Sequence, residues 1–333
     1  MTDDVEPVVE STQLTHFGDP FAEQKALAGG SGWVRLRDTT VLEVTGADRI
    51  GWLDSLTSHR IEPGKSAQAL ILDPHGHVEY DLHVIDEPDR TWLLVASDTA
   101  EDLRTYLDSM RFLMDVAVTD RADAYDVIWV PRRNGEPGHP YWPVPPEFAG
   151  AGFTESGSDR GGGADKYIRS RPGTICGAEV VYPKGEHPSG PECGTWALAA
   201  LRIAAGMPQV GTDTDHKSLP HELGLIGPAV HLAKGCYRGQ ETVARLHNMG
   251  RPPRRLVLLH FDGALPETGD DVVLSDKVVG RVGSVAQHYE LGPIGLAVVK
   301  RSVPLDAQLT AGGIEAAQEE IVVAEPMNQG ESA

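Results

Sequence analysis

Short strand-like runs that alternate irregularly with short helical patterns constrain the fold of this chain most. The runs at 40–44, 91–96 and 127–130 are rich in Val, Leu, Ile and Trp, which favours strands. Between them, residues 47–53 and 99–110 carry apolar side chains at helical spacing. With 37 Gly and 24 Pro, about a fifth of the chain favours turns. We therefore expect an α+β fold, with helices packed on mostly antiparallel sheet.

The last quarter of the chain carries strand patterns only. It follows the proline pair Pro252-Pro253. Its strand-like runs are 256–259, 271–274, 278–282 and 296–299. Short strands joined by polar or glycine turns predict a small β-barrel over residues 253–325.

The length of 333 residues corresponds to about two domains. We expect a loose acidic segment over 1–20 and a main folded region over 21–250. Within that region, 131–164 is rich in proline and glycine, so we predict a surface insertion that can be shortened without unfolding the protein. An apolar stripe over 195–203, followed by Gly206, predicts a further helix and its end.

The formal net charge of −20 argues against nonspecific binding to nucleic acid or to an anionic membrane surface. No run of 18 apolar residues is present, so no membrane span is expected. The acidic first residues lack the features of a signal peptide. Three widely spaced cysteines do not form a disulfide framework, which favours a reducing cytoplasm.

The segment 234–242 holds the densest group of chemically active residues. Cys236 lies two residues from both Lys234 and Arg238, just before a predicted helix at 242–247. Nearby cations and a helix N-terminus both favour a reactive thiolate. The alternative is that Cys236 is a small, inert, buried residue, as free cysteines often are. Spacing alone leaves both interpretations open.

The string Lys-Gly-Cys-Tyr-Arg-Gly-Gln-Glu at 234–241 resembles the K-G-C-Y-x-G-Q-E signature of YgfZ-type proteins, a branch of the glycine-cleavage T-protein (GcvT, aminomethyltransferase) superfamily. Further segments of the chain resemble other motifs of that family, and together they extend over about residues 25–305. These segments are 44–48, 53–58, 202–208, 219–224, 254–257 and the G-x-V-x-S turn at 280–284.

This resemblance implies GcvT-like folate-binding domains of ferredoxin-like type, a C-terminal barrel and a central channel for tetrahydrofolate or a derivative. It implies a role in assembling or repairing iron–sulfur clusters in client proteins, including tRNA-modifying enzymes. Cys236 would be the functional thiol, with Tyr237, Gln240 and Glu241 beside the folate. No direct contact with nucleic acid is expected.

Folate recognition is expected at two places. Glu222 matches the T-protein carboxylate that binds the pterin ring, whose edge presents two adjacent N–H donors to one carboxylate. The alternative is an exposed glutamate at a turn. Four cations within eleven residues could hold the glutamate carboxylates of folate: Arg245, Arg251, Arg254 and Arg255. They could equally form a solvated face or a partner-docking patch.

The departures from the T-protein pattern bear on activity. Its G-G-x-x-D-D-L string corresponds to 76–82, where Tyr80 replaces one aspartate and Asp81 remains. Ala204 stands where T-proteins commonly have glutamate. These losses argue against glycine cleavage and favour the YgfZ-type role. Two alternatives stay open: a folate-dependent one-carbon transferase that uses Asp81, and a pure interaction module.

The run Asp73-Pro74-His75-Gly76-His77, with His83 nearby, has a His-x-His spacing that suits zinc or iron. Its proline and glycine favour a turn between two strands instead. We therefore predict a turn here and no metal site.

Overall fold

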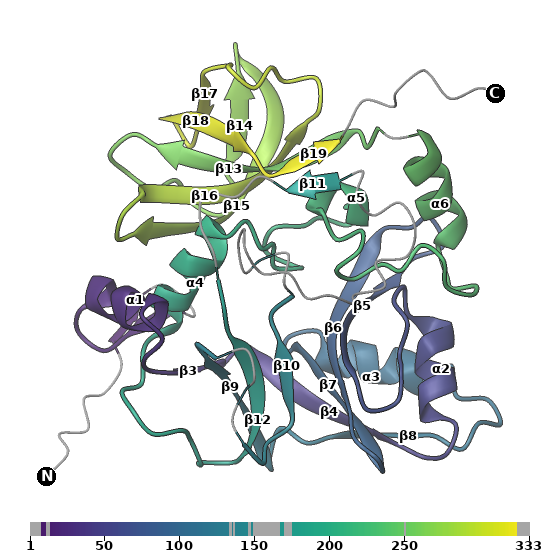
Figure 1. The fold of residues 1–333 in the computed structure, drawn as a ribbon. Coiled ribbons are helices and arrows are strands. Elements are labelled where there is room, and N and C mark those ends of the chain that lie inside the picture. The colour runs from purple at the N-terminus through teal and green to yellow at the C-terminus, as the bar shows by residue number, and fades with distance from the viewer. Residues whose placement is uncertain are drawn as a thin grey trace, which may run out of the picture.

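Two antiparallel sheets and a closed barrel make up most of the protein, and helix α4 (Thr195–Ala204) lies between them (Figure 1). The computed structural model describes residues 8–10, 14–132, 135, 137–145, 148, 167–169, 175–249 and 251–324. The barrel lies on one side of α4 and the two sheets lie on the other. The predicted α+β class with a C-terminal barrel is confirmed.

The larger sheet has five strands in the order β5-β6-β7-β4-β8. Their bounds are β4 Thr39–Thr45, β5 Ser66–Leu72, β6 Val78–Asp86, β7 Arg90–Ala96 and β8 Ala117–Asp120. Helices α2 (Arg49–Leu56) and α3 (Ala100–Ser109) bury their apolar stripes with one face of this sheet. Leu53, Leu56 and Leu103 lie in that core, as the helical periodicity predicted, and Trp52 joins them from outside the predicted stripe.

The second sheet has the order β10-β12-β9-β3. Its strands are β3 Val34–Arg35, β9 Tyr125–Val130, β10 Tyr141–Pro143 and β12 Ala178–Pro183.

Part of the predicted surface insertion belongs to this sheet and its core, which corrects the sequence-based expectation. Trp142, Val144 and Phe148 are at most 2% exposed and pack in one hydrophobic cluster. A few well-placed apolar residues are enough to bury a proline-rich segment. Residues 133, 134, 136, 146, 147 and 149–164 of the predicted insertion lie outside the described residues.

The N-terminal segment is also more ordered than predicted over 14–20. Strands β1 (Val8–Glu10) and β2 (Leu14–His16) form a hairpin, and Asp19 caps helix α1 (Pro20–Ala28). The Thr15 amide donates to Thr195 Oγ1 at 3.0 Å. A Cβ at Gly194 would lie 1.8 Å from the Thr15 carbonyl oxygen, so only glycine allows this approach. Residues 1–7 and 11–13 of the predicted loose segment lie outside the described residues.

The barrel closes in the order β13-β16-β15-β14-β17-β18. Its strands are β13 Arg254–Phe261, β14 Asp271–Leu274, β15 Lys277–His288, β16 Gly292–Lys300, β17 Leu309–Ala311 and β18 Ile314–Glu320. An apolar cluster that includes Val257, Leu259 and Val272 forms its own core. The segment 280–284, which was predicted to be a turn, instead lies in the middle of β15. A register shift follows Val282 there.

The remaining elements join the barrel to the sheets. Strand β11 (Tyr167–Arg169) pairs with β19 (Val322–Ala324), and helix α5 (Pro220–Leu223) contacts β13. Helix α6 (Gln240–Met249) begins two residues before the predicted helix. Among the described helices, none has the length and apolar content needed to cross a membrane.

Candidate functional site

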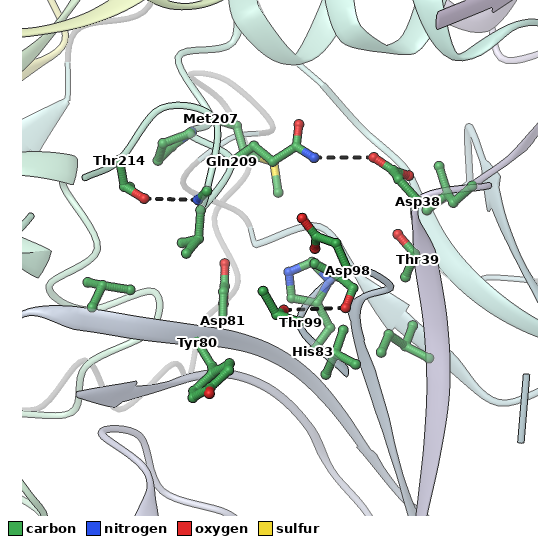
Figure 2. Close-up of a pocket in the computed structure, with 18 of the residues that line it drawn as sticks. Asp38, Thr39, Tyr80, Asp81, His83, Asp98, Thr99, Met207, Gln209 and Thr214 are labelled. Carbon is green, nitrogen blue, oxygen red and sulfur yellow. Dashed lines mark hydrogen bonds between the residues drawn. The ribbon is translucent and has the colours of Figure 1, made fainter. Parts of the chain in front are cut away.

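A cavity of about 470 Å³ lies where the two sheets, α4 and the loop 207–216 meet. This volume is in the range of sites that hold small-molecule ligands and cofactors. Strands β6 and β7 form one wall, and α4 contributes Leu198, Ala199 and Arg202. Figure 2 shows the loop residues Met207, Gln209 and Thr214 on the opposite side of the cavity from Asp81 on β6.

Tyr80 and Asp81 both border the cavity, but only the Asp81 side chain points into it. Figure 2 shows Asp81 pointing into the cavity and Tyr80 pointing to the other side of β6, as alternation along a strand requires. The Tyr80 ring lies 6.5 Å from the Tyr106 ring. The replacement of aspartate at position 80 therefore leaves the carboxylate of the cavity wall in place. The presence of Tyr80 is therefore weaker evidence against acid chemistry in the cavity than the sequence comparison suggested.

The Asp81 carboxylate is bound by an amide from the neighbouring strand. Gln68 Nε2 lies 3.1 and 2.8 Å from its two oxygens. Burial raises the pKa of Asp81 above its ordinary value, while His83 and Gln68 act in the opposite direction. Asp81 can therefore carry a proton at higher pH than a solvated aspartate.

His83, two residues further along β6, forms an ion pair with Glu179 of β12. His83 Nδ1 lies 2.7 Å from Glu179 Oε2, and both residues line the cavity. The His83 ring stacks on Trp142 with centroids 3.5 Å apart and planes 5° from parallel. Burial alone would lower the pKa of His83, but the adjacent Glu179 carboxylate outweighs it and raises this pKa.

The loop 207–216 is fixed to the barrel and to α4 by Asp213. Its carboxylate accepts from Arg202 Nη1 at 3.0 Å and from the Ser284 amide at 2.6 Å. A Cβ at Gly283 would lie 2.2 Å from Asp213 Oδ1, so the bulge in β15 and its glycine admit this contact. Gln209 reaches Asp38 across the cavity at 3.2 Å (Figure 2). The barrel thus positions one side of the site.

The cavity lining is acidic. Among the described lining residues, its carboxylates outnumber its basic side chains, which are His83, Arg202 and His216. The carboxylates belong to Asp38, Glu79, Asp81, Asp98, Glu179 and Asp215. Such a site favours a ligand that presents N–H donors or positive charge, and disfavours a phosphate-rich ligand.

Glu222, the predicted pterin ligand, does not line this cavity. It is fully buried, and its carboxylate accepts from Arg254 at 2.8 and 3.0 Å and from the Leu219 amide at 3.1 Å. Arg254 also binds Asp215 at 2.7 Å. The structure thus brings two predicted folate ligands together, but they satisfy each other at the junction of α5 and the barrel.

The four arginines do not form one patch. Arg255 is buried in the barrel, where it donates to the carbonyls of Arg301 and Val303 at 2.8 Å each. Arg245 and Arg251 are exposed, on α6 and just after it. Of these four arginines, Arg245 and Arg251 are therefore the ones that face solvent.

Cys236 lies exposed on a loop that is anchored on both sides. Lys234 is buried and donates to the carbonyls of Asp54, Thr57 and His59, at the C-terminal end of α2. Tyr237 is buried in a hydrophobic cluster, which raises its pKa to about 12. Lys234 thus directs its charge into α2, which weakens the predicted electrostatic activation of Cys236.

The same loop contacts the cavity wall from behind. Arg238 Nη1 lies 3.1 Å from Glu79 Oε2. Gly239 has φ +81°, and a Cβ there would lie 2.6 Å from the Asp73 carbonyl oxygen. Gln240 makes a 3.4 Å contact to the Lys234 carbonyl, and Glu241 is exposed. Neither Gln240 nor Glu241 lines the cavity.

The segment 73–77 forms the predicted turn between β5 and β6. Asp73 accepts from the amides of His75 and His77 and pairs with the His77 ring at 2.9 Å. Within the described part of the chain, no cluster of three His, Cys, Asp or Glu is arranged to hold a metal ion.

Glu179 is the cavity residue that sequence analysis missed, and His83 was noted only beside the Asp73–His77 turn. The available signal was a single charged side chain inside the apolar run Ala178–Tyr182. Buried charges are rare unless they are paired, so that pattern pointed to a partner such as His83.

Comparisons with known proteins agree with this architecture. Residues 254–324 match the family described as CAF17, C-terminal β-barrel domain. The aminomethyltransferase of Streptomyces coelicolor is 28% identical, over 72% of this chain and 69% of its own length. The aminomethyltransferase of Streptomyces avermitilis is 27% identical, over 85% of this chain and 82% of its own length. The tRNA-modifying protein YgfZ of Colwellia psychrerythraea is 34% identical over 100 residues, which is 28% of this chain and 30% of that protein.

Among solved structures, aminomethyltransferase T of the glycine cleavage system from Bartonella henselae superposes with a TM-score of 0.68. The match covers 96% of this chain and 93% of that chain at 14% identity, so it shows a common fold. Fold, barrel and sequence relatives agree with one another, and together they support a YgfZ-type protein of the aminomethyltransferase (GcvT-like) superfamily.

Proposed function

We propose that the cavity binds a reduced folate, tetrahydrofolate or a derivative, and that the protein is a cytoplasmic accessory factor for iron–sulfur client proteins. The observation that carries the folate assignment is Glu179, whose carboxylate is fixed in the cavity wall by His83. The pterin edge presents two adjacent N–H donors, which one carboxylate accepts together. Glu179 therefore replaces Glu222 as the pterin ligand in this proposal.

The residues of the site fit a folate in chemistry and in size. The acidic lining suits the N–H-rich pterin, and Leu36, Leu94 and Leu198 offer apolar surface for its planar rings. When bound, a folate would supply one-carbon chemistry at its ring nitrogens. The contribution of this chain is to bind the pterin, exclude water and hold a proton on Asp81.

A second role, for Cys236, is proposed separately. The support is its position: an exposed thiol on a loop held by Lys234 and Tyr237, joined to the cavity wall through the Arg238–Glu79 pair. Such a thiol can meet a client protein while its loop stays in contact with the folate site. Co-purification with wild-type and Cys236→Ser protein tests this, and equal recovery of iron–sulfur proteins would contradict it.

The alternative of a folate-dependent one-carbon transferase is favoured by one observation. Asp81 faces the cavity, and its raised pKa allows it to act as a proton carrier. A turnover assay with an aminomethyl donor and tetrahydrofolate separates the two. We expect at most trace turnover, and robust turnover would promote the transferase.

Calorimetric titration with 5-formyltetrahydrofolate, an air-stable reduced folate, tests the proposed cofactor. We expect a micromolar dissociation constant, which corresponds to about 8 kcal/mol. Absence of binding at near-millimolar concentrations would remove the folate assignment.

A further inference from the structure

His83 and Trp142 form a support behind the cavity carboxylate Glu179. Trp142 lies directly opposite Glu179 in the pairing of β10 with β12. The His83 ring stacks on Trp142 at 3.5 Å and holds Glu179 Oε2 at 2.7 Å. A planar ring clamped between an indole and a carboxylate has little rotational freedom. Glu179 is thereby held in one orientation, with Oε1 and the remaining lone pair of Oε2 left to accept from other donors.

The charges around this support make its ion pair significant. Asp81 faces His83 from the same strand, and Glu179 faces it from β12. Trp142 on the remaining side carries no charge. Within the described cavity lining, His83 is therefore the imidazole that faces two partly buried carboxylates, Asp81 and Glu179, and removing it would leave both without this counter-charge.

We propose that His83 is a positioning residue that keeps Glu179 aimed into the cavity and ionised, so that Glu179 accepts the paired N–H donors of a pterin edge. This inference rests on the proposed folate site. A protonated carboxyl group presents an O–H donor where the ligand also presents donors, so protonation abolishes the match. An unpaired, partly buried carboxylate takes up a proton at higher pH than a paired one. His83 thus extends the pH range over which the site recognises its ligand.

The test is the pH profile of 5-formyltetrahydrofolate binding, measured by calorimetry from pH 6.0 to 8.5 for wild type and His83→Leu. Wild-type affinity should fall less than that of the variant as pH is lowered over this range. The variant should bind more weakly as pH falls, approaching tenfold per pH unit where one proton must be released, and should recover towards wild type at pH 8.5. A loss that is the same at every pH would show a merely structural role and overturn the proposal. A profile identical to wild type would also overturn it.

Two further variants keep the test decisive. His187→Leu is the matched control, because His187 also stacks on a tryptophan (Trp33, 4.8 Å) but lies outside the cavity lining, and it should keep the wild-type profile. His83→Gln retains a neutral N–H donor and should give a pH dependence between those of wild type and His83→Leu. It also keeps the test available if His83→Leu fails to fold. A His83→Gln profile that coincides with wild type would contradict the role of the imidazolium charge. Failure of wild type to bind at any pH would instead reject the folate assignment.

Discussion

Replacing Trp142 by alanine tests whether the proline-rich segment belongs to the core. Trp142 is 1% exposed and is covered by the His83 ring at 3.5 Å. Truncating a buried tryptophan costs about 3–5 kcal/mol, because strands β6 and β12 cannot collapse into the space left behind. The lost ring stacking lies within that range and accounts for about 1 kcal/mol of it. We therefore expect Trp142→Ala to lower the free energy of unfolding by about 4 kcal/mol.

Urea denaturation, followed by far-ultraviolet circular dichroism, measures this loss. Trp142→Phe keeps a ring against His83 and should lose less than half as much. Leu113→Ala is the surface control: Leu113 is fully exposed, so its effect should stay within about 0.5 kcal/mol. A loss below about 1 kcal/mol for Trp142→Ala would refute the packing argument and restore the segment as a surface insertion.

Two further predictions concern Glu222 and the cysteines. Arg254→Met leaves the fully buried Glu222 carboxylate without its partner and should cost about 3–5 kcal/mol in urea denaturation. The exposed Arg245→Met is its control, and equal stability of the two variants would contradict a structural role for the Arg254–Glu222 pair. In competitive alkylation, Cys193 should label at least about tenfold more slowly than Cys236, because burial raises the pKa of Cys193 to about 11. Faster labelling of Cys193 would contradict its burial.

The sequence predicted the elements of the fold well, because periodicity reports burial on one face of each element. Leu103 and Leu107 of α3 are buried as their spacing indicates, and the run 256–259 lies in the first barrel strand. The sequence predicted burial less well in segments whose overall composition is polar or rich in proline, but in which a few side chains pack into the core. Trp142 and Phe148 draw a proline-rich segment into the core, and Thr15 fixes the N-terminal segment on α4.

The candidate site was predicted only in part. Asp81, predicted as a catalytic residue, does line the cavity, but which neighbour shares its face depends on strand alternation that the motif comparison ignored. Glu222 and Glu179 both lie on short elements, and the sequence does not distinguish their roles. The structure shows that Arg254 pairs with Glu222, whereas His83 pairs with Glu179 in the cavity wall. Long-range partners such as His83 and Glu179, 96 residues apart, leave no local pattern.

The most direct test of the central claim compares folate binding by wild type, Glu179→Gln and Glu222→Gln at pH 7.5. A glutamine amide at position 179 turns one acceptor oxygen into a donor that faces the N–H groups of the pterin. We expect this change to weaken 5-formyltetrahydrofolate binding at least about tenfold, while correctly folded Glu222→Gln stays within about threefold of wild type. Unchanged affinity in Glu179→Gln, or a selective loss in Glu222→Gln, would contradict a pterin site built on Glu179.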